Sequence, residues 1–496
     1  MSLNITRELK DLWPQTPAAS AHLLVQGLSS DSRHVKPGDL FVALKGHNSD
    51  ARDYVAEVIG KGAVAVLAEQ DEKWCESRLI QGVPVITVEN LSAKIGEIAA
   101  CFYGDPSREL IVLAVTGTNG KTSVANLLAG ALTALGKQAA VLGTVGNGFY
   151  GQLQPATHTT PNAIQLQQML AEFRAAGAEY VCMEASSHGL ELGRMTATRI
   201  HTALFTNLTR DHLDFHGDMA AYAAAKARLF AWPELKAAVL NADDEQFAAL
   251  KGVLANGVRL ESYSLHTGSG ANIVAQSVEP SLKGLHVGLR TAQGEATLDS
   301  PLLGRFNVAN LLAVLGGLLT LDIPLEQAVA ALAQVKPVPG RMECFSSDQG
   351  PTAVVDYAHT PDALEKVLAS LREHTAGQLW CVFGCGGDRD KGKRPQMAKI
   401  AERLADVVVV TTDNPRSEKP EQIIHEVRAG LAKPAQARTE LDRRAAIRHT
   451  IAAAGAQDIV LIAGKGHEDY QEIHGVRYPF SDVAEVKAAL AARRTA

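Results

Sequence analysis

One segment of the chain, between an apolar run and a helical pattern, reads Thr116-Gly117-Thr118-Asn119-Gly120-Lys121-Thr122. The apolar run 110–115 predicts a buried strand, and the pattern that follows predicts a helix from 121 to about 135. Glycines in such a loop let backbone N–H groups face a phosphate chain, and the helix N-terminus points at the same anion. The common form of this loop has a glycine five residues before Gly120, where this chain has Val115. The segment therefore predicts a compact variant of a nucleotide-binding phosphate loop.

Polar residues in and around this segment are the expected phosphate and metal ligands. Lys121 adds a positive charge for the terminal phosphates, and the Thr122 hydroxyl is of the type that ligates Mg²⁺. Glu184 directly follows an apolar run, at the end of an expected strand, where an acidic Mg²⁺ ligand is typical. Asn307 and the turn 241–244 are candidate contacts to the base or the ribose. The expected nucleotide-binding residues of the loop are Gly117, Thr118, Asn119, Gly120, Lys121, Thr122 and Ser123.

A second polar cluster follows the apolar run 203–205 and contains Asp211, His212, Asp214 and His216. His212 and His216 are four residues apart, so on a helix they would share one face, which could indicate zinc. We prefer His212 as a ligand of a second metal ion near the phosphates, and a hydrogen-bonded structural role for His216. Lys226 lies in the alanine-rich run 220–230, and read alone such a lysine is typical of a solvated helix face.

Apolar runs alternate with helical patterns through the second and third blocks of the chain. Continuous apolar strands between helices are typical of a parallel sheet covered on both faces, so we expect an α/β fold. The stretch 258–298 alternates polar and apolar residues and predicts a small antiparallel excursion. Turn-forming residues at 104–107 and 336–340 mark two boundaries. The expected domains are 1–107, 108–337 and 338–496.

Composition limits the classes of protein to which this chain can belong. With 48 Lys and Arg against 54 Asp and Glu, the net charge of −6 gives no support for a nucleic-acid or membrane surface. No apolar run approaches the roughly 20 residues that span a bilayer, and the first ten residues lack the apolar core of a secretory signal. The six scattered cysteines form no C-x-x-C pair, so we expect buried reduced thiols. We therefore expect a cytoplasmic monomer.

Further segments along the chain carry a resemblance to a known family. They read Asp31-Ser32-Arg33, Gly38-Asp39-Leu40-Phe41, Glu184-Ala185-Ser186-Ser187-His188-Gly189, Thr206-Asn207-Leu208-Thr209-Arg210-Asp211-His212-Leu213-Asp214, Ala225-Lys226, Gly340-Arg341-Met342-Glu343, Asp356-Tyr357-Ala358-His359-Thr360-Pro361 and Gly464-Lys465-Gly466-His467-Glu468. With the phosphate loop, and in this order, they resemble the Mur ligases. The resemblance implies an N-terminal UDP-substrate-binding domain, a central P-loop parallel-sheet ATPase domain and a C-terminal Rossmann-like α/β domain that binds the amino acid.

The resemblance also implies the reaction. Mur ligases use ATP to form an amide bond through an acyl phosphate during synthesis of peptidoglycan precursors. The segment Asp413-Asn414-Pro415-Arg416 resembles members that add meso-2,6-diaminopimelate to UDP-MurNAc-L-Ala-D-Glu, and lysine-adding relatives differ at the arginine position. An arginine fork suits the second carboxylate of diaminopimelate, because two parallel charge-assisted hydrogen bonds can hold it.

Residue roles follow from the same resemblance. It implies that Lys226 is carbamylated by CO₂, and that Glu468 could hold the distal ammonium of the amino acid. The implied catalytic residues are Lys121, Lys226, His212 and Glu184, and the implied Mg²⁺ ligands are Thr122, Glu184, His212 and Lys226. Asn307 and Arg341 join the nucleotide site. The implied amino-acid pocket contains Arg389, Asp413, Asn414, Pro415, Arg416, Gly464 and Glu468. The acceptor nucleotide would contact Ser30, Ser32, His47, Asn48 and Ser49 at its uridine end, and His158, Thr159, Thr160, Ser186, Leu192 and Arg194 at its sugar–peptide end.

Two of these positions depart from the pattern, since we expect asparagine where His158 stands and glutamine where Leu192 stands. Four other functions compete with the expected one. A lysine-adding ligase is the nearest alternative, and a folylpolyglutamate synthetase would share the ATP-binding block. A non-catalytic nucleotide switch would use the phosphate loop alone. A metal hydrolase built on His212 and His216 would leave that loop unused.

Overall fold

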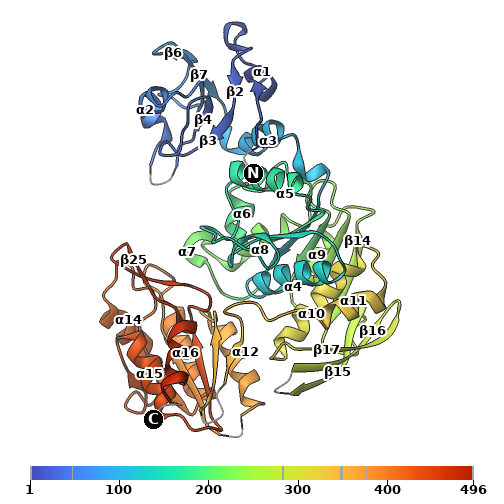
Figure 1. Ribbon diagram of the computed structural model, residues 1–496, viewed down its shortest axis with the longest axis vertical. Coiled ribbons are helices and arrows are strands. Elements are labelled where there is room, and N and C mark those ends of the chain that lie inside the picture. The colour runs from blue at the N-terminus through green and yellow to red at the C-terminus, as the bar shows by residue number, and fades with distance from the viewer. Residues whose placement is uncertain (1–2, 47–48, 282–283, 347–349, 376, 494–496) are drawn as a thin grey trace. The chain divides into compact units, whose positions relative to one another are not determined.

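The computed structural model describes residues 3–46, 49–281, 284–346, 350–375 and 377–493, so the expected substrate residues His47 and Asn48 lie outside the described part. The chain divides into two compact units. Unit 1 contains Met1–Ala114, Lys137–Ala203 and Arg228–Lys236, and unit 2 contains Val115–Gly136, Leu204–Ala227 and Ala237–Ala496. Figure 1 shows helices packed on sheets in both units, which confirms the predicted α/β class.

The N-terminal part of unit 1 is built on a five-stranded sheet with the order β3-β4-β5-β7-β6. Its strands are β3 (Gly27–Ser29), β4 (Asp39–Ala43), β5 (Ala65–Glu69), β6 (Arg78–Ile80) and β7 (Val83–Val88). All neighbours pair in parallel except β6, which is antiparallel to β7. Around them lie β1 (Arg7–Glu8), α1 (Leu9–Leu12), η1 (Ala18–Ser20), β2 (Leu24–Val25), η2 (Ala51–Tyr54), α2 (Val55–Gly60), α3 (Leu91–Tyr103) and η3 (Pro106–Arg108).

Both faces of this sheet are buried because successive side chains of its strands enter two different cores. In β4, Leu40 and Val42 pack in the core that contains residues of α3. Phe41 and Ala43 point the other way, into the core that contains residues of α2. All five residues of β4 are therefore buried, as expected for a strand of a parallel sheet with helices on both sides.

The rest of unit 1 contains β9 (Ala139–Leu142), β10 (Asn147–Phe149), α5 (Ala163–Ala175), β11 (Tyr180–Glu184) and α6 (Ser187–Glu191). β11 pairs in parallel with β9, and β10 pairs with the other edge of β9 in antiparallel fashion. The longest sheet of the chain has the strand order β10-β9-β11-β8-β12-β13-β14-β15-β16-β17. The division into units falls within β8 (Ile111–Thr116) and β12 (Thr202–Phe205).

Unit 2 begins with the elements that follow β8 and β12. They are α4 (Lys121–Ala134), α7 (Leu213–His216), α8 (Met219–Ala227), β13 (Ala237–Asn241), α9 (Phe247–Gly252), β14 (Arg259–Ser264), β15 (Ile273–Ser281), β16 (Gly284–Thr291), β17 (Gly294–Ser300), α10 (Phe306–Leu319) and α11 (Leu325–Leu332). The helix expected from residue 121 is confirmed as α4.

The prediction of an antiparallel excursion over 258–298 is wrong for its first strand, β14. β14 pairs in parallel with both β13 and β15, and only β15, β16 and β17 form an antiparallel meander. The alternating pattern misled because polar residues of β14 are buried with partners. Ser262 Oγ donates to Asn272 Oδ1 at 2.7 Å, and Ser264 Oγ donates to Asp243 Oδ1 at 2.5 Å.

The C-terminal part of unit 2 is a six-stranded sheet with the order β18-β19-β23-β20-β21-β22. All pairs are parallel except β18–β19. The elements are β18 (Glu343–Phe345), β19 (Thr352–Asp356), α12 (Pro361–Arg372), β20 (Leu379–Phe383), α13 (Lys393–Leu404), β21 (Val407–Val410), α14 (Pro420–Arg428), β22 (Arg438–Thr439), α15 (Arg443–Ala453), β23 (Ile459–Ala463), β24 (Tyr470–Ile473), β25 (Val476–Pro479) and α16 (Asp482–Arg493).

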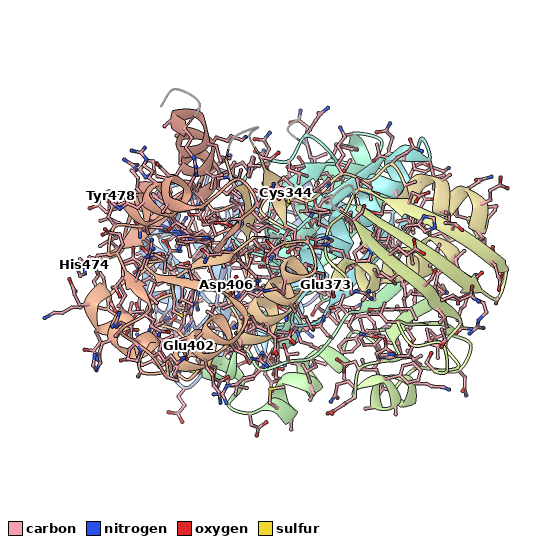
Figure 2. The ribbon with its side chains drawn as sticks, turned by 90° about the horizontal axis from the view of Figure 1, so that it is seen from below. Cys344, Glu373, Glu402, Asp406, His474 and Tyr478 are labelled. Carbon is pink, nitrogen blue, oxygen red and sulfur yellow. The ribbon has the colours of Figure 1, made fainter. Side chains whose placement is uncertain are left out.

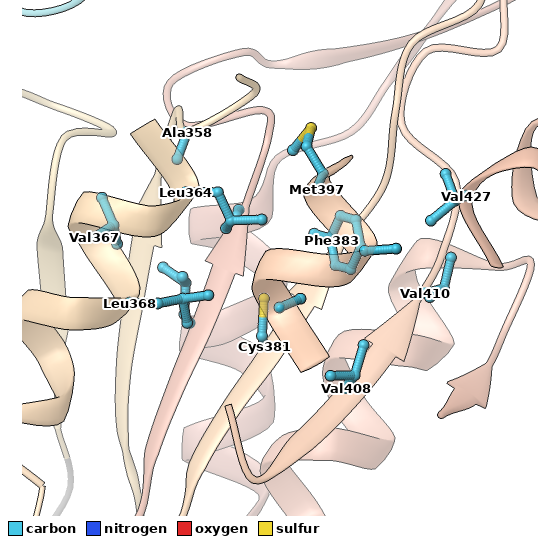
Figure 3. Packing of buried hydrophobic residues seen from close by; sticks show 14 of the residues in the cluster. Ala358, Leu364, Val367, Leu368, Cys381, Phe383, Met397, Val408, Val410 and Val427 are labelled. Atoms are coloured by element: carbon cyan, nitrogen blue, oxygen red, sulfur yellow. The ribbon is translucent and has the colours of Figure 1, made fainter. Parts of the chain in front are cut away.

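Helices cover both faces of this sheet. Cys381 and Phe383 of β20 pack with residues of α12 and α13 in one core, part of which Figure 3 shows. Trp380 and Val382 of the same strand enter the opposite core with residues of α15 and α16. Because strands and helices alternate, the carboxyl ends of β19, β20, β21 and β23 lie at one edge of the sheet, where ligands of such folds bind.

The expectation of buried thiols is wrong for half of the cysteines. Cys182, Cys381 and Cys385 are buried, whereas Cys75, Cys101 and Cys344 are exposed, and all six are free. Cys344 lies on the edge strand β18 and is labelled in Figure 2. Among the described residues, no helix combines the length and the apolar character that crossing a membrane requires.

Candidate active site

The phosphate loop connects β8 to α4, and two of its positions accept only glycine. Gly117 and Gly120 have φ angles of 144° and 87°, which L side chains rarely adopt. A Cβ added at Gly117 would lie 1.9 Å from Thr206 Oγ1, and one added at Gly120 would lie 2.7 Å from Asn310 Oδ1. The loop backbone is therefore fixed both by its own conformation and by the close approach of neighbouring chain.

Asn207 holds the loop from the side. Its carbonyl accepts a hydrogen bond from Thr118 N at 2.8 Å, and its Oδ1 accepts one from Asn119 N at 3.0 Å. Its Nδ2 donates to Asn119 O at 3.1 Å, and Thr206 Oγ1 donates to the same carbonyl at 2.6 Å. Asn207 was missed as a functional residue from the sequence, although its position two residues after the end of β12 was an available signal.

Lys121 and Thr122, at the start of α4, face polar partners. Lys121 Nζ donates to Gly117 O and to Thr118 O, each at 2.8 Å, so the ammonium lies against the loop. Thr122 Oγ1 accepts a hydrogen bond from Arg341 Nη2 at 3.1 Å. The Arg341 guanidinium also lies 4.4 Å from the centre of the Tyr357 ring. Arg341, expected at the nucleotide site, thus does lie at the loop.

Asn307, the other expected nucleotide contact, reaches the loop through Asn310. Its Nδ2 donates to Leu303 O at 2.7 Å, and its Oδ1 accepts from Asn310 Nδ2 at 2.8 Å. The oxygen of the Asn310 amide in turn is the atom closest to a Cβ added at Gly120. Asn307 therefore orients Asn310 against the loop.

Lys226 is buried, so the solvated-face interpretation is wrong. Only 2% of its surface is exposed, and its Nζ donates to Gly117 O at 2.9 Å and lies 4.3 Å from the centre of the Tyr222 ring. Burial lowers the pKa of this amine well below its usual value, and the charge of Lys121 lowers it further. The alanine-rich helix gave no hint of this burial, because the carbonyl that Lys226 contacts lies in the phosphate loop, 109 positions away.

The Asp211 carboxylate lies next to a backbone N–H group and two histidine rings. Its Oδ1 accepts from the backbone N of His212 at 2.9 Å, and its Oδ2 lies 3.5 Å from His212 Nε2 and 4.0 Å from His359 Nε2. Burial alone would raise the pKa of Asp211, but the charges of His212, His359 and Lys393 outweigh it and lower the pKa to about 2. Burial lowers the pKa of His359 to about 4. At neutral pH this cluster therefore contains an ionised carboxylate.

His216 points toward an aromatic partner. Its ring lies 5.1 Å from the ring of Tyr222, which also contacts His212 at 6.0 Å. Within the described residues, no group of three or more His, Cys, Asp and Glu side chains is arranged to hold a metal ion. The zinc interpretation of the histidine pair gains no support from this geometry.

In unit 1, Glu184 ends β11 and is 1% exposed. Its Oε1 accepts from Thr144 N at 2.7 Å, and its Oε2 accepts from Thr144 Oγ1 at 3.2 Å. Thr144 Oγ1 also lies 3.1 Å from Thr159 Oγ1, one of the expected acceptor-binding residues. Thr144 was missed from the sequence, because it lies 40 residues before Glu184 and carries no motif of its own.

Of the other sugar–peptide candidates, Ser186 and Arg194 contact Thr160 directly. Thr160 Oγ1 donates to Glu184 O at 2.8 Å and lies 3.0 Å from Ser186 Oγ, which caps α6 by accepting from Gly189 N. Arg194 Nη1 donates to Thr160 O at 2.9 Å, and burial lowers the pKa of this guanidinium. His158 bonds with Thr157 Oγ1 through its Nδ1 at 3.1 Å. Leu192 is 46% exposed.

The uridine-end candidates lie in loops after β3 and β4. Ser30 and Ser32 are partly buried, and Ser32 O accepts a hydrogen bond from Lys61 Nζ at 2.8 Å. Ser49 is exposed, and its carbonyl accepts from Gly46 N at 3.0 Å. Asp31, between the two serines, is bound by Arg33 at 2.6 Å.

In the loops that follow β21 and β23, Asn414 and Glu468 bind each other and both bind Lys465. Asn414 Nδ2 donates to Glu468 Oε2 at 2.9 Å, and Lys465 Nζ donates to Asn414 Oδ1 at 2.9 Å and to Glu468 Oε2 at 2.8 Å. Asp413 is buried beside Gly464, where a Cβ would lie 2.6 Å from Asp413 Oδ2. Burial would raise the pKa of Asp413, but the charges of Lys465 and Arg443 lower it. Four expected pocket residues are therefore brought together.

Arg416 has a φ of 50°, an uncommon left-handed conformation for a large side chain. Its Nη1 donates to Gly387 O at 2.7 Å, and its Nε lies 3.6 Å from Glu472 Oε2. Its backbone is paired with Ile473 of β24. Arg389 is exposed, and its Cγ lies 3.8 Å from a Cβ added at Gly386. Lys465 and Glu472 were not assigned to the pocket from the sequence, because their contacts span more than 50 positions.

Comparisons with known proteins agree with this arrangement. Three family models match the chain in order: "Mur ligase family, catalytic domain" over residues 24–103, "Mur ligase middle domain" over 115–318, and "Mur ligase, glutamate ligase domain" over 340–466. The predicted architecture of an N-terminal, a central nucleotide-binding and a C-terminal domain is thereby confirmed, while its boundaries stay a prediction.

Individual relatives are similar over nearly the whole chain. UDP-N-acetylmuramoyl-L-alanyl-D-glutamate--2,6-diaminopimelate ligase of Ectopseudomonas mendocina is 50% identical over 96% of this chain and 97% of its own. The protein of the same name from Pseudomonas aeruginosa is 50% identical over 98% of each chain. A solved structure of a ligase of this name is 38% identical, covers 99% of this chain and 100% of its own, and has a TM-score of 0.71. The chain therefore belongs to the Mur ligase family.

Proposed function

We propose that this Mur ligase adds meso-2,6-diaminopimelate to UDP-MurNAc-L-Ala-D-Glu, with hydrolysis of ATP to ADP and phosphate, in the synthesis of peptidoglycan precursors. One observation carries the choice of amino acid. Arg416 lies in the loop after β21, where its Nη1 donates to Gly387 O. Asn414 of the same loop hydrogen-bonds with Lys465 and Glu468. The relatives at 50% identity bear the name of a 2,6-diaminopimelate ligase.

The pocket suits an amino acid with charges at both ends. The Arg416 guanidinium would bind the distal carboxylate through two parallel N–H···O bonds, which lysine cannot accept because it lacks that carboxylate. Glu468, which accepts from Asn414 and Lys465, would receive the distal ammonium. The same side chains would thus bind one end of diaminopimelate and leave the other amine free to react.

ATP activates the acceptor in the first step. The γ-carboxylate oxygen of the D-glutamyl residue attacks the γ-phosphorus of ATP, the bond to the β,γ-bridging oxygen breaks, and ADP leaves. Lys121, Arg341 and the loop N–H groups would offset the repulsion between the two anions. Their placement at one loop supports this assignment.

In the second step the amine of diaminopimelate attacks the acyl carbon. A tetrahedral intermediate forms and collapses as phosphate leaves, and the nitrogen loses its proton to solvent or to a base. Water would compete for the acyl phosphate, so exclusion of solvent protects the intermediate. The linker at 336–340 is the proposed hinge for domain closure.

The resemblance to the family implies a magnesium site around Lys226 and His212, although the described His, Cys, Asp and Glu side chains form no ready-made group of three or more for a metal ion. As in the family, we assign Thr122, Glu184, His212 and carbamylated Lys226 as ligands. A carbamate forms only on a neutral amine, and burial of the Lys226 amine lowers its pKa and so favours that form. When bound, Mg²⁺ would neutralise charge between the phosphates and the carboxylate.

Phosphate release with UDP-MurNAc-L-Ala-D-Glu and ATP tests the proposal, with meso-diaminopimelate, L-lysine or no amino acid as the third component. We expect release only with diaminopimelate. A preference for lysine would favour the lysine-adding alternative. Release that requires folate and glutamate instead would identify a folylpolyglutamate synthetase. A nucleotide switch would release no phosphate in response to any amino acid. We place the reaction in the cytoplasm and expect a monomer, which light scattering would test.

A further inference from the structure

The loop that follows β20 touches the motif at 413–416 along its whole length. Gly387 O accepts from Arg416 Nη1 at 2.7 Å, and Gly387 N donates to Asn414 O at 2.9 Å. A Cβ added at Gly386 would lie 2.9 Å from Arg416 Nη1, and one added at Gly387 would lie 1.9 Å from Pro415 O. Any shift of this loop therefore moves the acceptor that orients the Arg416 fork.

Arg394 and Glu418 hold the loop from its other side. Arg394 Nη2 donates to Gly386 O at 3.0 Å. Its two Nη atoms bind the two oxygens of Glu418 at 2.8 and 3.0 Å, and Nη1 also binds Glu426 at 2.5 Å. Glu418 Oε1 in addition accepts from Asp388 N at 2.7 Å. The ion pair thus fixes a carbonyl and an N–H on either side of Gly387.

The pair is built as a permanent bidentate clamp. The Arg394 side chain is fully buried, and Glu418 exposes only 14% of its side chain. The hydrogen bonds from Arg394 lower the pKa of Glu418 to about 2, so both partners stay charged at neutral pH. Arg394 lies in the first turn of α13, and Glu426 lies on α14. Two helices are therefore tied to one loop.

We propose that the Arg394–Glu418 ion pair is a positioning device that sets the specificity for an amino acid with a second carboxylate. This inference rests on the proposed function. Neither residue would touch the substrate. They act through Gly386, Gly387 and Asp388, which place the acceptor of Arg416 Nη1. A bidentate contact depends on the direction of the guanidinium plane, so a small loop shift weakens binding of the distal carboxylate. The phosphate loop has its own partners and stays unaffected.

Two variants and a matched control test the proposal in the full-length enzyme. Glu418→Gln keeps the shape of the side chain and removes its charge, and Arg394→Lys keeps the charge and removes the fork. Asp406→Asn is the control, because Asp406 also binds an arginine, Arg372, at 2.8 Å and accepts from a backbone N–H, Leu379 N, at 2.8 Å. Asp406, labelled in Figure 2, lies in the same C-terminal part of unit 2 as Glu418, and its side chain is more exposed than that of Glu418.

We expect Glu418→Gln and Arg394→Lys to raise the KM for diaminopimelate about tenfold, with less than about a twofold change in the KM for ATP or in kcat at saturating amino acid. The preference for diaminopimelate over lysine, measured as the ratio of kcat/KM values, should fall by about the same factor. Asp406→Asn should change none of these quantities. A purely structural role would lower the Tm without changing this ratio.

An unchanged KM for diaminopimelate in both variants overturns the inference, as does an equal rise in the KM values for ATP and diaminopimelate. A variant that fails to fold is replaced by Glu426→Gln, which removes one partner of the same clamp and should show the same selective effect in weaker form. A wild-type enzyme with no dependence on diaminopimelate contradicts the proposed function and the inference together. Dependence in the wild type with unchanged variants contradicts the inference alone.

Discussion

The phosphate loop and the pocket at 413–416 hold their central cations by different means. The Lys121 ammonium lies against two carbonyls of its own loop, at 2.8 Å from each. The Arg416 guanidinium is held by Gly387 O from another loop and by Glu472 from the hairpin β24–β25. Backbone therefore orients the first cation, while the second also depends on side chains from distant segments.

This difference separates the shared chemistry from the selective chemistry. A loop fixed by two glycines and by Asn207 has a shape that few substitutions could preserve, as suits a phosphate chain common to all reactions of this type. A guanidinium oriented by an ion-pair network can be redirected by single changes. We therefore expect substitutions at the loop to abolish turnover and substitutions at the pocket to change which amino acid is used.

The largest effect is expected at the phosphate loop. Lys121→Ala should lower kcat by about a thousandfold, because the charge that offsets two meeting anions is lost. Circular dichroism and Tm should stay close to wild type. Lys251→Ala, on the exposed side of α9, is the control and should be fully active. Normal turnover of the Lys121 variant would remove the assignment of this loop.

Lys226→Ala should lower kcat by about a hundredfold, since the carbamate that would help to hold the metal cannot form. Short carboxylates such as acetate should restore part of the activity. Carbon-13 NMR with labelled CO₂ gives a readout independent of turnover, with a carbamate signal expected in the wild type and absent from the variant. A fully active variant, or a wild type without this signal, would contradict the carbamate.

Arg416→Ala should raise the KM for diaminopimelate about a hundredfold and leave the KM for ATP within about twofold, because one charged bidentate contact is lost. Arg416→Lys should give an intermediate value, since lysine keeps the charge and loses the fork. Steady-state kinetics with each substrate varied in turn would measure this. Equal effects on both KM values would show that Arg416 does not select the amino acid.

The smallest effect concerns acid stability. The folded protein lowers the pKa of His359 from 6.5 to about 4, so the unfolded chain binds this proton first and stability falls as pH decreases from 6.5 to about 4. The side chain is 39% exposed, and after allowance for solvent screening the expected loss is about 1 kcal/mol. His359→Gln should remove this part of the pH dependence of unfolding. An unchanged profile between pH 7 and 4 would contradict it.

The two regions also differ in how much of them the sequence could predict. The phosphate loop was predicted in detail, because its glycines, lysine and threonine are adjacent and lie between a strand and a helix. Asn207, Thr144, Lys465 and Glu472 were missed, because their contacts depend on strand order. The burial of Lys226 was likewise hidden, since an alanine-rich helix does not reveal what covers it. The parallel pairing of β14 was obscured by its buried serines.

Product analysis by mass spectrometry tests the central claim most directly. The enzyme is incubated with ATP, UDP-MurNAc-L-Ala-D-Glu and an equimolar mixture of meso-diaminopimelate and L-lysine. We predict a single nucleotide product whose mass has increased by one diaminopimelate residue, with one ADP formed per product. A product that carries lysine, or ADP formation without any new nucleotide, would contradict it.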